Sequence, residues 1–186
     1  GIRDRDVTGV QTCALPISVF KEGWHPAETP EGNRGVEWQW TKKDAVLTFK
    51  RPQKDATLVL DLDNPSTEFH DPQKVSVTLA GRAVDEFTVT APQRVLRKIK
   101  LAAADMGTAD MADVTISVDK TFVPATVSPA ASKDTRELGV RVFHAHAGCH
   151  GTPVGLGGYR KIGHQTVVAR SHVPLPARVD VGVAES

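Results

Sequence analysis

Between residues 36 and 143, apolar and polar side chains alternate with a period of two, and this alternation constrains the fold more than any other feature of the sequence. A period of two sends successive side chains to opposite faces of a strand, so that one face is buried and the other meets solvent. A helix would instead need apolar residues every three to four positions. The pattern therefore predicts a series of half-buried β-strands.

About eight such segments follow one another, separated by Gly, Pro, Asn and Asp residues that form turns. Gly81-Arg82 is typical of a hairpin turn, and residues 101–111 are expected to form a loop with at most a short helix, because Gly107 interrupts them. Short strands at nearly regular intervals predict an all-β fold, an antiparallel and jelly-roll-like β-sandwich. The expected strands are 37–41, 45–49, 57–62, 75–79, 84–89, 94–101, 114–118 and 138–143.

The first 17 residues do not fit this pattern and resemble a translated sequencing adapter. Gly1–Asp4 and Val7–Ile17 translate one reading frame of a common short-read library adapter, and Arg5-Asp6 falls at its variable index. Segments of this kind are set aside before the fold is considered. We therefore expect residues 1–17 to be non-native and disordered, and the chain to be a metagenomic fragment that lacks an upstream region.

The composition changes after Phe143. Five of the seven histidines and seven of the fifteen glycines lie in residues 144–186. This segment is either a genuine His/Gly-rich extension or the product of a reading-frame slip, and composition does not separate the two. We predict a β-sandwich domain over residues 18–143 and a weakly ordered tail over residues 144–186.

The charge balance argues against several classes of partner. The chain has 23 basic and 22 acidic residues, so no strong field attracts nucleic acid or anionic lipid. No apolar run approaches the length of a transmembrane helix. With Cys13 assigned to the adapter, Cys149 is the remaining cysteine, and no internal disulfide is expected. Because no phosphate-binding, metalloprotease or hydrolase motif is present either, we expect a non-catalytic domain without a cofactor.

Segments near both ends of the predicted domain resemble a known family. Phe20–Glu28, Trp38–Thr41 and Ala45–Leu47 resemble the start of an accessory β-domain that follows the membrane part of some bacterial glycosyltransferases. Those enzymes are similar to the dolichyl-phosphate-mannose-protein mannosyltransferase group. Thr121–Ala125 and Ser132–Val140 resemble the closing pattern of the same domain.

The resemblance covers Phe20–Phe143. It implies a non-catalytic domain on the extracytoplasmic face of a bacterial membrane, with a carbohydrate or glycolipid as ligand and the catalytic residues in a missing upstream part. A free-standing carbohydrate-binding module of a surface or secreted protein is the alternative. A small metal-binding protein is a second alternative.

Trp24 and His25 are candidate ligand-binding residues. A loop tryptophan beside Pro26 can stack on the apolar face of a sugar ring, while polar neighbours bind its hydroxyl groups. Trp38 and Trp40 lie two residues apart on the first predicted strand. We favour a core position for both, because burial of aromatic rings strongly stabilises a fold.

Arg136 is a third candidate, because its guanidinium group can bind a ligand carboxylate or hydroxyl through two parallel hydrogen bonds. An ion pair with an acidic neighbour is the favoured interpretation. His144, His146, Cys149 and His150 offer the side chains that zinc prefers, within seven residues. Their spacing departs from that of structural zinc sites, which join two separated ligand pairs, so these residues are weak candidates and no metal is expected.

Overall fold

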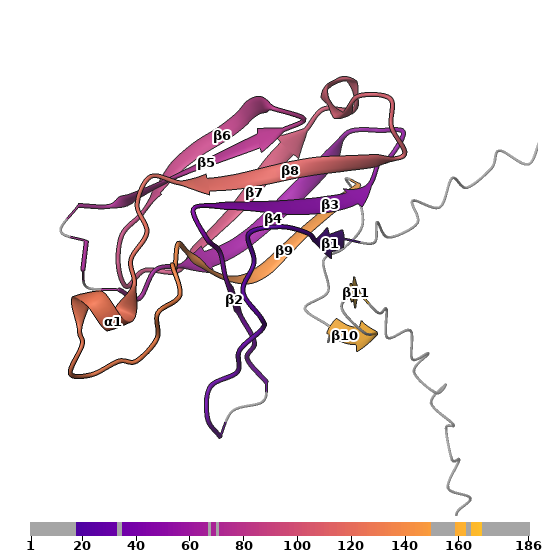
Figure 1. The fold of residues 1–186 in the computed structure, drawn as a ribbon. Coiled ribbons are helices and arrows are strands. Elements are labelled where there is room, and N and C mark those ends of the chain that lie inside the picture. Colours follow the sequence, from indigo (N-terminus) through magenta and orange to yellow (C-terminus); the bar gives the residue numbers. More distant parts are fainter. Residues whose placement is uncertain are drawn as a thin grey trace, which may run out of the picture.

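The structure is a computed structural model that describes residues 18–32, 35–66, 68–69, 71–149, 159–162 and 165–168. The segment 1–17 lies outside the described residues. Two antiparallel sheets face each other across an apolar core, so the predicted β-sandwich is confirmed (Figure 1). The strands are β1 (Ser18–Phe20), β2 (Gln39–Trp40), β3 (Asp44–Lys50), β4 (Ala56–Asp63), β5 (Gln73–Leu79), β6 (Arg82–Val89), β7 (Val95–Leu101), β8 (Met111–Val118), β9 (Arg141–Cys149), β10 (Tyr159–Ile162) and β11 (Gln165–Val168).

The chain crosses between the two sheets at most of its connections. One sheet has the order β10-β11-β1-β3-β8-β5-β6 and the other the order β2-β9-β4-β7. From β3 to β9, only the β5–β6 hairpin joins consecutive strands within one sheet. In Figure 1 the strands β3, β8 and β5 lie in front of β4, β7 and β9. This connectivity is jelly-roll-like, and it buries one face of each sheet.

Aliphatic side chains from both sheets form the core. The inward positions of β4, β5 and β8 alternate with outward ones, as the sequence pattern predicts. Complete burial of such a side chain stabilises the fold by roughly 1.5–3 kcal/mol before the loss of chain entropy is counted. The fully buried residues include Leu47, Phe49, Leu58, Leu60, Leu62, Val75, Val77, Leu79 and Ile116.

Two glycines occupy positions that other residues would strain. The predicted β5–β6 turn is present but lies one residue earlier than Gly81-Arg82, because Arg82 already belongs to β6. Gly81 has a φ of +82° and forms this turn together with Ala80, whose φ is +48°. Gly139 lies where the chain enters β9. A Cβ atom at Gly139 would stand 2.5 Å from Thr41 Oγ1 and 2.6 Å from the carbonyl oxygen of Lys42. Only a residue without a side chain allows this close approach of the two segments.

The strand β9 continues past the domain boundary that the sequence predicts at Phe143. It pairs with β4 as far as Cys149, and its inward residues Ala145 and Ala147 are 8% and 2% exposed. A register shift leaves Phe143 without a partner on β4, so that Val142 and Ala145 both face the core. This bulge breaks the period of two, and alanines add little apolar signal, which explains why the sequence did not reveal the extension.

Among the described residues, helical structure is limited to two short segments. A 3₁₀ turn at Ala103–Met106 lies in the loop where the sequence allows a short helix, and α1 spans Pro124–Val127. Within the described part of the chain, neither segment has the length or the apolar character that a membrane-crossing helix requires.

Candidate ligand-binding pocket

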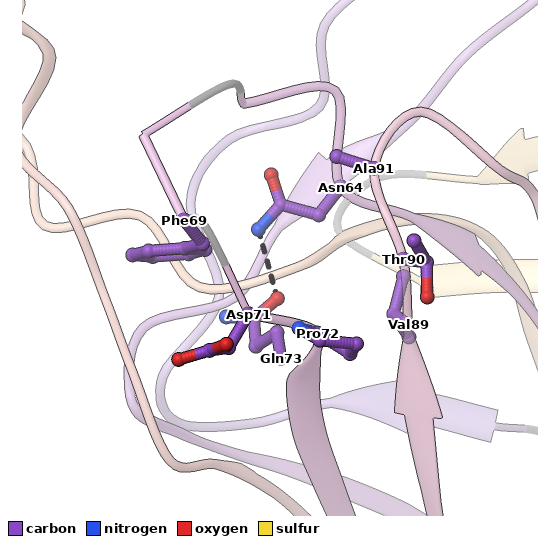
Figure 2. A pocket seen from close by; sticks show the side chains of 8 residues that line it. All are labelled: Asn64, Phe69, Asp71, Pro72, Gln73, Val89, Thr90 and Ala91. Atoms are coloured by element: carbon purple, nitrogen blue, oxygen red, sulfur yellow. Dashed lines mark hydrogen bonds between the residues drawn. The ribbon is translucent and has the colours of Figure 1, made fainter.

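A pocket lies at the end of the sandwich where the β4–β5 loop meets the β6–β7 loop (Figure 2). Its volume is about 80 Å³, which holds several water molecules or one end of a small ligand. The lining residues are Asn64, Phe69, Asp71, Pro72, Gln73, Val89, Thr90 and Ala91.

Two buried amides fix one wall of this pocket. Asn64 and Gln73 are each 1% exposed, and Asn64 Nδ2 donates to Gln73 Oε1 at 2.8 Å (Figure 2). Gln73 Nε2 in turn donates to the carbonyl oxygens of Lys120 at 2.6 Å and Gly139 at 3.3 Å. Buried amides held on several sides are rigid, because each lost hydrogen bond would leave an unpaired polar atom. The amide pair therefore ties the β4–β5 loop to the segments on either side of α1.

An aromatic ring with fixed neighbours stands beside the amide pair. Phe69 is half-buried, and its ring centroid lies 5.9 Å from that of Phe122 in an edge-to-face arrangement. Phe122 makes the same kind of contact with the buried Trp40 at 5.8 Å. The Lys120 ammonium lies 5.6 Å from the Phe69 centroid and donates to the carbonyl oxygen of Asp71 at 3.2 Å. Phe69 is thus an aromatic surface with a restricted orientation.

The rim carries two polar side chains that are available to a ligand. The Asp71 carboxylate and the Thr90 hydroxyl are exposed, and neither forms a hydrogen bond or ion pair with another described side chain or backbone group. In Figure 2, Phe69 and Asp71 project to one side of the Asn64–Gln73 pair, and Thr90 stands on the other side. The pocket therefore combines an aromatic ring, a carboxylate and a hydroxyl around a fixed polar wall.

Trp24, predicted as an exposed stacking residue, is half-buried in the structure. Its indole N–H donates to the carbonyl oxygen of Val46 at 2.8 Å, and its ring centroid lies 4.6 Å from that of Phe20. It also packs against the core. These contacts hold the segment before β2 against β3. A role of Trp24 in ligand binding stays a prediction.

The structure brings His25 and Arg136 close together. His25 is 8% exposed, and its Nε2 donates to the carbonyl oxygen of Glu137 at 2.7 Å. Arg136 binds Asp134 through Nε and Nη2, and Glu28 through Nη1 at 2.6 Å. The hydrogen bonds from Arg136 lower the pKa of Asp134 to about 2, while the same carboxylates raise the pKa of Arg136. Both predicted residues are therefore engaged in contacts within the chain.

The predicted metal candidates are only partly described. His144 and His146 lie two residues apart on the outward face of β9, as the sequence suggests. Burial lowers the pKa of both imidazoles, so both are neutral at pH 7. The side chain of Cys149 and the whole of His150 lie outside the described residues. Within the described part of the chain, no group of three His, Cys, Asp or Glu side chains is placed to hold a metal ion.

The pocket residues were missed by sequence reasoning. Asn64-Pro65 and Asp71-Pro72 mark turns, and this signal predicts a loop but not a site. The pocket forms because this loop meets the β6–β7 loop, and two such loops become neighbours only when the sheets are stacked. The positions of Phe69 and Thr90 on the same pocket are not visible in a one-dimensional pattern.

No family model matches this chain, and no curated protein matches it. Several solved structures are similar over about three quarters of its length. One is a family GH115 4-O-methyl-α-glucuronidase with specificity for decorated arabinogalactans, with 14% identity and a TM-score of 0.40 over 74% of this chain and 16% of that chain. The chain thus spans a small part of that enzyme.

Two isolated modules are similar over nearly their whole length. The CBM36-1 domain of a multidomain xylanase from the hindgut metagenome of Trinervitermes trinervoides is 8% identical, with a TM-score of 0.42 over 74% of this chain and 99% of that chain. A family 35 carbohydrate binding module from Clostridium thermocellum is 12% identical, with a TM-score of 0.40 over 72% and 98% of the two chains. At such low sequence identities and TM-scores, the ligand of this chain has to be argued from its own residues.

Proposed function

We propose that this chain is a non-catalytic carbohydrate-binding domain and that the pocket beside Phe69 holds one end of a sugar. The observation that carries the proposal is the meeting of an oriented aromatic ring with an available carboxylate and hydroxyl at one pocket. A sugar ring has an apolar face that packs on an aromatic surface, and its edge carries hydroxyl groups that need donors and acceptors.

The roles of the individual side chains follow from their positions. Phe69 supplies the surface on which the sugar ring packs. Asp71 accepts hydrogen bonds from sugar hydroxyls, and a carboxylate acceptor forms stronger bonds than a neutral one. Thr90 can donate or accept at the opposite rim. Because the pocket is about 80 Å³, it encloses one end of a sugar, and the rest of a longer glycan extends into solvent.

The test is a binding measurement on the full 186-residue chain against a panel of neutral oligosaccharides, followed by calorimetry with the best ligand. We expect Phe69→Ala to weaken binding about tenfold or more, as the loss of an aromatic anchor does. Asp71→Asn keeps the size of the side chain and removes its charge, so a smaller loss is expected.

Phe87→Ala is the matched control. Phe87 is a half-buried phenylalanine on β6. Like Phe69, it has a cationic group against its ring, because Arg97 Cζ lies 4.9 Å from its ring centroid. This variant should bind like the parent chain. If the Phe69 and Phe87 variants lose affinity equally, or if no sugar of the panel binds the parent chain at millimolar concentration, the pocket is not a sugar site.

We further propose that the domain belongs to a bacterial membrane glycosyltransferase and lies on the extracytoplasmic face of its membrane. The resemblance over Phe20–Phe143 supports this proposal. The two segments that carry it also touch each other, through Arg136 with Glu28 and through His25 with the Glu137 carbonyl. The segments thus act as one structural unit.

Sequencing of the source DNA upstream of this reading frame tests the proposed parent protein. A series of codons for long apolar helices is expected. A start codon followed by a signal peptide would instead favour a free-standing carbohydrate-binding module of a surface or secreted protein. In that case the proposed sugar site would be unaffected, whereas the proposal of a glycosyltransferase as parent protein would be wrong.

A further inference from the structure

The outward face of the four-stranded sheet carries side chains in three cross-strand rows. β4 lies between β7 and β9, and side chains at matching register positions of neighbouring strands stand about 5 Å apart. Read from β7 through β4 to β9, the rows are Leu96–Asp61–His144, Lys98–Val59–His146 and Lys100–Thr57–Gly148.

Positive charge on these rows is only partly balanced. Asp61 supplies their single carboxylate, and it is paired with Arg94 from the end of the β6–β7 connection. Lys98 and Lys100 are exposed, and neither forms an ion pair with another described residue. They lie two residues apart on β7, so their Cα atoms are separated by about 7 Å along the strand. This arrangement leaves two neighbouring ammonium groups without a paired carboxylate among the described residues.

The middle of the face is low, and one end of its third row is open. Val59 is 7% exposed although it points outward, because the longer Lys98 and His146 side chains flank it in its row. At Gly148 a Cβ would meet no described residue within 4 Å, so the described part of the chain leaves the third row open at its β9 end. His146 Nδ1 is buried and has no hydrogen-bond partner among the described residues. The open row and the two lysines together favour a ligand that lies along β7.

We propose that this face, defined by the three rows, binds a polyanionic glycan whose carboxylate or sulfate groups contact Lys98 and Lys100. The two ammonium groups bind successive anionic groups of the polymer. Val59 forms the low floor, and His146 borders it on the β9 side. This site lies on the side of the sandwich, whereas the pocket beside Phe69 lies at its end, so each can be occupied without the other.

A glycan fits the face better than a lipid bilayer or a nucleic acid. Leu96, 61% exposed, is the one large exposed apolar residue of these rows, and a single leucine provides little insertion into a bilayer. The formal net charge of the chain is +1, so the field that attracts nucleic acid over long distances is missing. Contact with a flexible polyanion needs only local positive charge on an open face.

The test compares dextran sulfate with uncharged dextran, which has the same backbone, on the full chain. We expect the chain to bind dextran sulfate and not dextran, with an affinity that falls as salt rises. The double variant Lys98→Gln/Lys100→Gln should weaken the binding roughly tenfold at low salt and reduce the dependence of log K on log salt by about one to two. Glutamine keeps most of each side chain, and both sites are exposed, so the variant should fold.

Two controls make the outcome decisive. Lys42→Gln/Lys43→Gln removes two exposed lysines from the β2–β3 connection and should leave binding unchanged. Phe69→Ala should also leave it unchanged, which separates this site from the sugar pocket. The proposal is overturned if both lysine pairs have the same effect, if dextran binds as well as dextran sulfate, or if only phosphatidylglycerol vesicles bind the face.

Discussion

The outer faces of the two sheets are built from different kinds of side chain. On the seven-stranded sheet, the outward positions where β5 pairs with β8 include small hydroxyl residues that lie opposite each other. Ser76 lies opposite Ser117, and Thr78 lies opposite Thr115. The ion pairs at the margins of this face are exposed, and Lys74 and Glu86 form one of them with side chains 54% and 61% exposed.

On the four-stranded sheet, aromatic rings and arginines stack on each other. Arg94 Cζ lies 3.8 Å from the Phe143 centroid, and Arg141 Cζ lies 4.8 Å from that of Trp38. Each arginine also binds a β4 carboxylate through two hydrogen bonds, and Arg141 binds Asp63 at 2.8 and 2.7 Å. Both sheets contribute apolar side chains to the same core, so the difference described here lies in the outer faces. We therefore expect the outer face to contribute more to the stability of the four-stranded sheet than it does to that of the seven-stranded sheet.

The strongest test of this contrast is Arg141→Ala. The Asp63 side chain is 8% exposed and would lose its partner, and an unpaired buried carboxylate is costly. We expect the free energy of unfolding to fall by about 3 kcal/mol in urea melts. Arg141→Lys should recover only part of the loss, because lysine lacks the planar fork. If the free energy of unfolding of the alanine variant decreases by less than about 0.5 kcal/mol, the comparison between the two sheets has no basis.

Arg94→Ala should have a smaller effect of the same sign. The Arg94 side chain is 46% exposed, so solvent weakens its attraction to Asp61. The alanine variant also loses the contact between Arg94 and the Phe143 ring. We expect a loss of about 1 kcal/mol in the same melts. Arg94→Met, which keeps contact with the ring without the charge, divides the loss between packing and charge.

Because two histidines lie on β9 of the four-stranded sheet, we expect the stability of the chain to depend on pH. Burial lowers the pKa of His144 and His146 in the folded state, so the unfolded chain binds more protons below its ordinary histidine pKa. As far as these two histidines are concerned, the free energy of unfolding is therefore highest above about pH 6.5 and decreases as the pH falls below that value. The nearby charges are Asp61, which opposes the shift in His144, and Arg94, which adds to it.

Melts of His144→Gln/His146→Gln between pH 7 and pH 5 check this dependence. The double variant should show a flatter profile than the parent chain over this range. Below pH 4, the parent chain and the double variant should both lose stability. Asp134 has a folded pKa of about 2, so it becomes protonated and loses its ion pair with Arg136 only in that acid range. Equal slopes between pH 7 and pH 5 would contradict the assignment to these histidines.

The smallest expected effect lies on the seven-stranded sheet. Lys74→Ala breaks the exposed pair with Glu86, and such pairs contribute little because water screens both charges. The free energy of unfolding should change by less than about 0.5 kcal/mol. A loss as large as that of Arg141→Ala would show that both sheets rely on their outer faces.

The strand pattern was largely readable from the sequence, and its failures have identifiable causes. The alternation along β7 placed Ile99 and Leu101 on the buried face and Lys98 and Lys100 on the exposed one, as observed. The end of β9 was misplaced because a bulge at Phe143 interrupts the alternation. Sequence reasoning can follow a period, but a bulge is a property of two paired strands and leaves no periodic signal in one of them.

Candidate site residues were harder to predict than strands. Trp24 and Arg136 were singled out by residue type, and both prove to be engaged within the chain. The pocket residues Phe69 and Thr90 belong to two loops that are separated by two strands in the sequence. Their meeting depends on how the sheets stack, and residue type alone carries no information about it.

The sequence by itself determined that this chain forms paired strands with one apolar face each, because side chains alternate across a strand whatever the partner. It also indicated the β5–β6 turn, because a glycine such as Gly81 adopts a positive φ without strain. Only the tertiary structure decided which outward side chains become neighbours. The Arg141–Trp38 stack, the lysine-bearing rows and the Phe69 pocket all join residues distant in sequence. Strand register and sheet stacking fix such contacts, and both result from burial of the whole core at once.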